Sequence, residues 1–159
     1  MTIDNQFTIP SNWYFEESFL NKEKKRIFLK EWQLIGSRSQ IKNPGEILVA
    51  EVANNPIIIT CQDDNTLKAF YNVCQHRGGP LAYENCSVNK LQCKYHGWVY
   101  SHQGDLLSVR DPEDFRDLDF SCRSLVSVRC ERFGNLIFVN FDNDCVSLEE
   151  YLGPIADEW

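Results

Sequence analysis

Two short segments of the sequence each place a cysteine and a histidine at the spacing of metal ligands. They are Cys74-x-His76 and Cys93-x-x-His96, with residues 77–92 between them. Thiolate and imidazole side chains are the usual protein ligands of zinc and of iron–sulfur clusters. The chain has only three histidines, so two of them would have to fall into this pattern by accident if they were ordinary core residues. The pattern therefore predicts a metal centre held between two loops, which the fold must bring together.

Two kinds of metal centre use such a set of ligands. One is a tetrahedral zinc ion, and the other is a [2Fe–2S] cluster with both cysteines on one iron and both histidines on the other. Zinc sites usually separate the first two ligands by two to four residues, whereas one residue separates Cys74 from His76. Gly78, Gly79 and Gly97 let the backbone approach a cluster and donate N–H groups to its sulfides. We therefore expect a cluster, with zinc as the alternative.

The mixed ligand set also predicts the chemistry of the cluster. Two neutral imidazoles in place of two thiolates make it less negative by two charges, so it accepts an electron more easily. Clusters of this kind have potentials of about −150 to +300 mV, against about −400 mV for plant-type ferredoxins. Because the outer nitrogens of His76 and His96 can bind or release protons, the potential should depend on pH. The predicted chemistry is one-electron transfer.

The remainder of the sequence predicts a mostly β fold. Asn54-Asn55 and Gly134-Asn135 are turn signals, and each separates two segments rich in Ile, Val and Leu. Short strands divided by such turns are typical of a small antiparallel barrel or sandwich. The expected strands cover residues 46–52, 56–60, 67–73, 125–131 and 136–141.

Helices are expected only near the two ends. Residues 16–31 contain no Gly or Pro, and their apolar side chains are spaced to share one helical face: Phe19, Leu20, Ile27 and Phe28. Ser147 and Glu150 have the spacing of a capping box, which predicts the start of a short helix. We expect an N-terminal helical arm over 1–40, a cluster-binding domain over 41–141, and the start of a missing further domain over 142–159.

Composition excludes several classes of function. A net charge of −7 disfavours nucleic acid as a partner and is compatible with a basic redox partner. No apolar run approaches the ~20 residues of a membrane helix, and the first six residues do not resemble a secretory signal. A cytoplasmic protein with no membrane partner is expected. Its cysteines outside the two motifs should be small buried side chains: Cys61, Cys86, Cys122, Cys130 and Cys145.

Two further segments are expected to be solvated loops. Residues 111–119 carry many acids, with a helical turn expected after Pro112. His102 lies in a turn-like segment and is expected to face solvent.

Taken together, these segments resemble the N-terminal Rieske domain of the α subunits of ring-hydroxylating oxygenases. The resemblance implies a Rieske iron–sulfur-protein-like β barrel with two cluster-binding loops. It implies the [2Fe–2S] ligands Cys74, His76, Cys93 and His96. It also implies that three further side chains lie around the cluster, those of Arg77, Tyr95 and Trp98. Of these, Trp98 is expected to shield the cluster. The motifs that carry the resemblance lie in residues 12–14, 26–28, 32–36, 69–78, 93–100, 104–106 and 134–140. Residues 32–33 and 40–42 favour the choline-monooxygenase-like branch of the family.

In that family the domain accepts an electron from a flavin-containing reductase or a ferredoxin. It passes the electron to a mononuclear non-haem iron in a separate catalytic domain of a monooxygenase or dioxygenase. Such an iron needs two histidines and a carboxylate, and only His102 remains once His76 and His96 are used. We therefore expect no mononuclear iron site and no catalytic residue here. On this reading the chain is the electron-transfer part of an oxidoreductase, inactive as an oxygenase alone.

Two alternatives within the same cluster type remain. A free-standing Rieske-type ferredoxin would act as an electron shuttle, but the helix at 16–31 and the residues after Phe141 exceed what such a protein needs. Respiratory Rieske proteins carry an extra cysteine in each ligand loop and a serine after the second His-Gly. Here the loops have no such cysteines and Trp98 takes the serine's place. We therefore expect a potential in the low part of the Rieske range.

Overall fold

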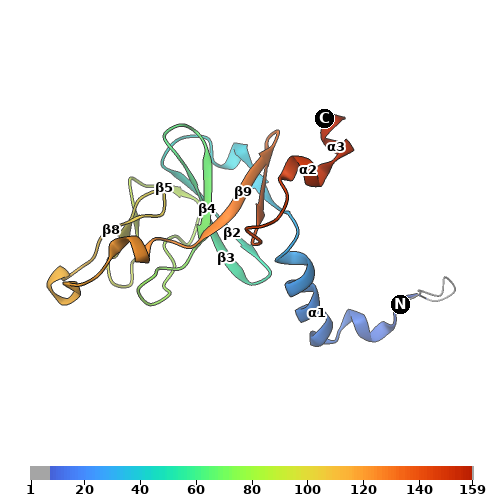
Figure 1. The fold of residues 1–159 in the computed structure, drawn as a ribbon, viewed down its shortest axis with the longest axis horizontal. Helices are drawn as coiled ribbons and strands as arrows, with labels where there is room; N and C mark the ends of the chain where they lie inside the picture. Colours follow the sequence, from blue (N-terminus) through green and yellow to red (C-terminus); the bar gives the residue numbers. More distant parts are fainter. Residues whose placement is uncertain (1–7, 159) are drawn as a thin grey trace.

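An antiparallel sheet of seven strands forms the centre of the molecule. The computed structural model describes residues 8–158 (Figure 1). The sheet consists of β1 (Gln33–Ser37), β2 (Glu46–Val52), β3 (Asn55–Cys61), β4 (Leu67–Tyr71), β5 (Cys86–Ser87), β9 (Ser127–Phe133) and β10 (Leu136–Asn140). Their order across the sheet is β1-β10-β9-β4-β3-β2-β5, and every neighbouring pair is antiparallel. The predicted mostly β fold is confirmed.

A second, smaller sheet lies at one end of the molecule. It has three strands, β6 (Leu91–Gln92), β7 (Val99–Tyr100) and β8 (Leu106–Ser108). These strands are two or three residues long, too short to show the alternation by which strands are predicted. We call residues 72–123, which contain this sheet, the loops around it and the edge strand β5 of the large sheet, the cluster lobe.

Two hairpins anchor the large sheet. Gly134 has a φ of +55° and opens a two-residue turn between the paired Phe133 and Leu136, as predicted. In the other hairpin the turn residues are Ala53 and Asn54, which have φ values of +50° and +68°. The predicted turn was therefore placed one residue too late.

Both faces of the central strand β3 are buried, which explains its continuous apolar run. Alternate side chains of a strand point to opposite faces of the sheet, so Ile58 packs toward the cluster lobe while Ile57 and Ile59 join the opposite core. At the lobe side, a Cβ added to Gly104 would lie 2.5 Å from the ring of Phe70. Only glycine permits this approach, which holds the small sheet against the large one.

The helices lie at the end of the molecule opposite the cluster lobe (Figure 1). They are α1 (Glu17–Glu23), which continues as a π-helical turn over Lys24–Phe28, and α2 (Leu148–Leu152) and α3 (Pro154–Asp157). The hydroxyl of Ser147 accepts the N–H of Glu150 at 3.2 Å, which confirms Ser147 as the N-cap but is only one of the two hydrogen bonds of the predicted capping box. None of the helices within residues 8–158 has the length and apolarity needed to cross a membrane.

Single 3₁₀ turns complete the chain at Ser11–Tyr14, Arg38–Gln40, Pro112–Phe115 and Phe120–Arg123. The third of these is the helical turn predicted after Pro112. Residues 1–7, on which the prediction of no secretory signal depends, lie outside the described residues, as does Trp159.

Candidate metal centre

The two predicted ligand loops have the same backbone hydrogen bonds. In each loop the cysteine N–H donates to the carbonyl five residues later, at 2.8 Å for Cys74 and 2.9 Å for Cys93. The glycine four residues after the cysteine donates its N–H back to the cysteine carbonyl, at 2.9 Å for both Gly78 and Gly97. Both glycines have a positive φ, +74° and +73°, which other residues adopt only with strain. The shared Cys-x-x-x-Gly spacing therefore folds into two matching turns.

The structure brings cysteine beside cysteine and histidine beside histidine. The Cys74 and Cys93 side chains are both 2% exposed, and their thiols lie close enough to interact. Burial raises the pKa of the Cys74 thiol, a hydrogen bond with Tyr100 lowers it, and the proximity of Cys93 raises it. The rings of His76 and His96 meet edge-on, with centroids 4.7 Å apart and an interplanar angle of 70°. The four side chains thus come together as a cysteine pair and a histidine pair.

His76 carries an atom that a metal would satisfy. Its Nδ1 is buried and has no hydrogen-bond partner among the described residues, and such atoms are costly unless something binds them. Burial, together with the nearby His96 and Arg77, lowers the pKa of His76, which favours the neutral ring that ligates metals. Within residues 8–158 no three His, Cys, Asp or Glu side chains converge to hold a single metal ion.

The three other predicted residues take different positions. Trp98 is 3% exposed and its ring stacks on that of His76, with centroids 4.9 Å apart and planes 8° from parallel. Tyr95 places its ring 3.9 Å from that of His96 but is 63% exposed. Arg77 is exposed and forms no hydrogen bond or ion pair within the described part of the chain. It affects His76 through its charge alone.

Sequence reasoning missed two residues that touch the predicted ligands. The hydroxyl of the fully buried Tyr100 lies 3.3 Å from Sγ of Cys74 and accepts the N–H of Gln75 at 3.0 Å. Because a thiolate that ligates iron carries no proton, the hydroxyl would be the donor in this contact. Phe115 packs edge-on against His76, with ring centroids 6.0 Å apart and an interplanar angle of 87°. Both contacts arise from packing between distant segments, which no local motif signals.

Three expectations about other residues are wrong. His102 was expected to be solvated, but its ring is partly buried, with Nε2 enclosed and unpaired among the described residues. Its position is fixed because its carbonyl accepts hydrogen bonds from Thr60 and Gln62, both at 2.8 Å. Cys86 and Cys122 were expected to be buried and are exposed, since both lie in surface segments of the cluster lobe.

The fold and this site define a Rieske-type protein, and the comparison with protein families agrees. Residues 31–124 match the model of the Rieske [2Fe-2S] domain, and the chain belongs to that family. The predicted resemblance to ring-hydroxylating oxygenases is confirmed by individual relatives. The chain is 32% identical over 147 residues to the carnitine monooxygenase oxygenase subunit of Escherichia coli (strain K12), covering 92% of this chain and 39% of that one. It is 33% identical over 156 residues to the chloroplastic choline monooxygenase of Spinacia oleracea, covering 98% and 35%.

Solved structures show the same relationship. The quaternary ammonium Rieske monooxygenase CntA in complex with L-carnitine superposes with a TM-score of 0.89 at 29% identity, over 95% of this chain and 43% of that one. Naphthalene 1,2-dioxygenase with indole bound gives a TM-score of 0.85 at 33% identity, over 90% and 33%. The chain therefore spans between a third and a half of the length of these relatives.

Proposed function

We propose that Cys74 and Cys93 bind one iron of the Rieske cluster and that His76 and His96 bind the other. The observation that carries this assignment is the pairing of like side chains in two matching loops, with the buried Nδ1 of His76 left for a metal. When bound, the cluster supplies reversible one-electron transfer.

In this proposal the surrounding side chains of the lobe orient the ligands and exclude water. Trp98 stacks on one face of His76, and Phe115 meets both rings edge-on, so the imidazole is fixed and covered. Tyr100 holds its hydroxyl against the sulfur of Cys74. Tyr95 lies on His96 with most of its ring in solvent, and Arg77 adds positive charge near His76.

We further propose that the chain relays electrons within a Rieske oxygenase. A flavin-containing reductase or a ferredoxin would supply the electron, and a catalytic domain with a mononuclear iron would receive it. The support is the family and the greater length of its oxygenase relatives. On this proposal residues 1–40 form an arm, 41–141 hold the cluster, and 142–159 lead toward the catalytic domain.

The placement of the cluster lobe favours an acceptor on a neighbouring subunit. The lobe lies at the end of the molecule away from α2 and α3 (Figure 1), so a domain joined beyond them would begin far from the ligands. The structure of the quaternary ammonium Rieske monooxygenase CntA gives insight into inter-subunit electron transfer in that protein. Leu20, Ile27 and Phe28 are exposed on the arm. A free shuttle would present these apolar side chains to water, whereas in a larger assembly another part of the oxygenase would cover them.

A redox titration of the chain with its cluster assembled tests the proposed function. We expect a red-brown protein that takes up one electron per cluster, with a midpoint between about −150 and 0 mV, the low part of the Rieske range. Zinc would give a colourless protein with no midpoint. A midpoint well above zero would contradict the assignment to the oxygenase type.

Tyr100→Phe is expected to lower that midpoint by about 40 mV. The hydroxyl donates to a sulfur that is more negative in the reduced cluster, so removing it destabilises the reduced state by about 1 kcal/mol, which for one electron is about 40 mV. The matched control is Tyr83→Phe, since Tyr83 is 66% exposed, and it should leave the midpoint unchanged. Equal midpoints for Tyr100→Phe and the wild type would show that the hydroxyl does not act on the sulfur.

A further inference from the structure

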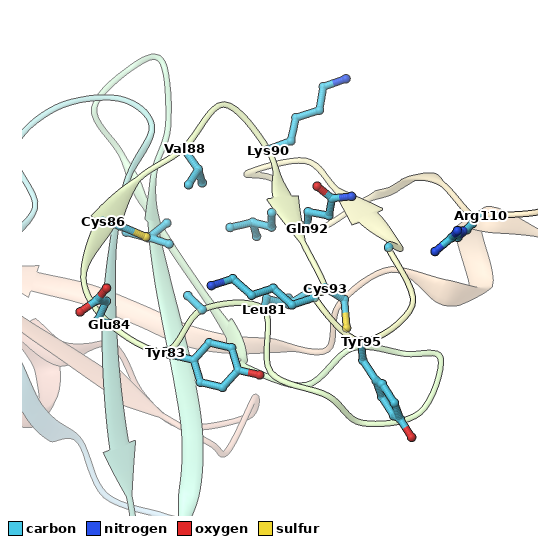
Figure 2. A pocket seen from close by; sticks show the side chains of 15 residues that line it. Leu81, Tyr83, Glu84, Cys86, Val88, Lys90, Gln92, Cys93, Tyr95 and Arg110 are labelled. Carbon is cyan, nitrogen blue, oxygen red and sulfur yellow. The ribbon is translucent and has the colours of Figure 1, made fainter.

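A hollow of about 690 Å³ opens beside the second ligand loop (Figure 2). Most of its lining comes from residues 81–97, with Ile47 and Arg110 completing it. Cys93, one of the proposed ligands, lies in the lining, so the hollow borders the proposed cluster site directly. Lys90 extends outward at one end and Tyr95 at the other (Figure 2).

The charge of this hollow is opposite to the charge of the whole chain. Its lining includes the cations Lys90, Lys94 and Arg110 and the single acid Glu84, whereas the chain as a whole carries −7. Arg110 lies 3.8 Å from the exposed Asp111 and is partly offset by it. Lys90 and Lys94 form no ion pair within residues 8–158. The hollow is therefore a local cationic surface on an acidic protein.

Two exposed tyrosines add the features of a protein interface. Tyr83 and Tyr95 are 66% and 63% exposed, and the ammonium of Lys94 lies over the ring of Tyr83, 5.4 Å from its centroid. Tyrosine is enriched at sites where proteins bind each other, and complementary charge steers partners to such sites. The ring of Tyr95 also contacts His96, with 3.9 Å between centroids. A protein seated on this surface would lie one aromatic ring away from a proposed iron ligand.

We propose that this hollow docks the electron donor and that the donor presents an acidic surface to it. The proposal rests on the proposed function of the cluster. On contact one electron leaves the donor, which is oxidised by one electron, and enters the cluster, which is reduced by one; no bond forms or breaks. The net charge of the whole chain, −7, would by itself favour a basic donor rather than an acidic one. The local cations dominate at contact because charges farther than about 10 Å are largely screened at 0.1 M salt.

The salt dependence of electron transfer tests the sign of the docking surface. The probe is a reduced, acidic plant-type [2Fe–2S] ferredoxin at about −400 mV, which can reduce a Rieske cluster spontaneously. The second-order rate is measured by stopped flow from about 0.1 to 1 M ionic strength, over which the Debye length falls from about 10 to 3 Å, so that distant charges are screened throughout. We expect the rate to fall about tenfold or more. If the net charge of −7 governs docking, the rate will rise with salt, and the proposal is overturned.

Charge reversal locates the surface. We expect Lys90→Glu/Lys94→Glu to slow transfer about tenfold at low salt and to abolish its fall with salt. The control, Lys25→Glu/Arg26→Glu, makes the same change in total charge on exposed residues of the arm, and should change the rate less than twofold. Equal slowing in both double variants would contradict the proposal.

The variant Lys90→Glu, together with the spectrum and midpoint of the cluster, distinguishes failure of the docking proposal from failure of the proposed function. Lys90→Glu lies outside both ligand loops, so it should keep the spectrum and midpoint of the wild type while still slowing transfer about threefold. A wild-type chain without a Rieske spectrum would overturn the proposed function itself. An intact cluster whose reduction is indifferent to Lys90 and Lys94 would overturn the docking site alone.

Discussion

Cys93→Ser is expected to lose the cluster and much of the stability of the fold together. Serine does not form the anionic ligand that the iron requires. The Cys93 side chain is buried in a core that also contains Cys74, so loss of the cluster would leave the two ligand loops without the metal that joins them, and the hydroxyl of serine would be buried there. Because binding of such a centre is coupled to folding, the free energy of unfolding should fall by about 3 kcal/mol or more, a drop of about 10 °C in Tm.

Iron content, visible absorption and thermal melting measure this result. Cys86→Ser is the matched control, because Cys86 is exposed and lies outside both loops, and it should keep the colour and Tm of the wild type. A colourless Cys93→Ser chain that melts at the temperature of the wild-type holoprotein would contradict the coupling. A chain that retains both irons would contradict the role of Cys93 as a ligand.

His96→Cys should keep a cluster, at least in part, and lower its midpoint by about 100 mV or more. The substitution replaces a neutral ligand by a thiolate, which makes both redox states more negative and the added electron less favourable. Exchange of both histidines for cysteines accounts for at least about 250 mV between Rieske and plant-type clusters, so one exchange should give roughly half of that difference.

The matched control for this variant is His102→Cys, the same substitution at the remaining histidine of the chain. His102 lies in the cluster lobe but contacts none of the four proposed ligands in the hydrogen bonds and ring contacts of the described residues, so its midpoint should match the wild type. An unchanged midpoint in His96→Cys would contradict the assignment of His96 to the iron.

The two candidate ligand loops and the main strands could be predicted because each depends on neighbouring residues. Cys-x-His and Cys-x-x-His are local spacings, and the alternation of β2 (Glu46–Val52) is local as well. β1 was missed because a bulge between Leu34 and Gly36 breaks its alternation. Positions set by tertiary packing had no local signal. Tyr100, on the small sheet, reaches Cys74 in the first ligand loop, and Phe115 reaches His76 from an acidic segment.

The charge of the hollow also depends on tertiary packing and could not be predicted from the sequence. The net charge of −7 is a sum over the chain and favours a basic partner. The acids of residues 111–119 all lie outside the lining of the hollow, which holds three cations, although Asp111 pairs with one of them, Arg110. The sum therefore hides a surface of the opposite sign, which becomes visible only when the loops are placed in space.

Pulsed electron paramagnetic resonance of the reduced chain, with its histidines labelled with ¹⁵N, tests the ligand assignment most directly. If His76 and His96 bind one iron of a two-iron cluster, the spectrum will show hyperfine coupling to two histidine nitrogens, and only one will remain in His96→Cys. A paramagnetic cluster without coupling to histidine nitrogen, or a zinc-bound chain without any signal, would contradict the assignment.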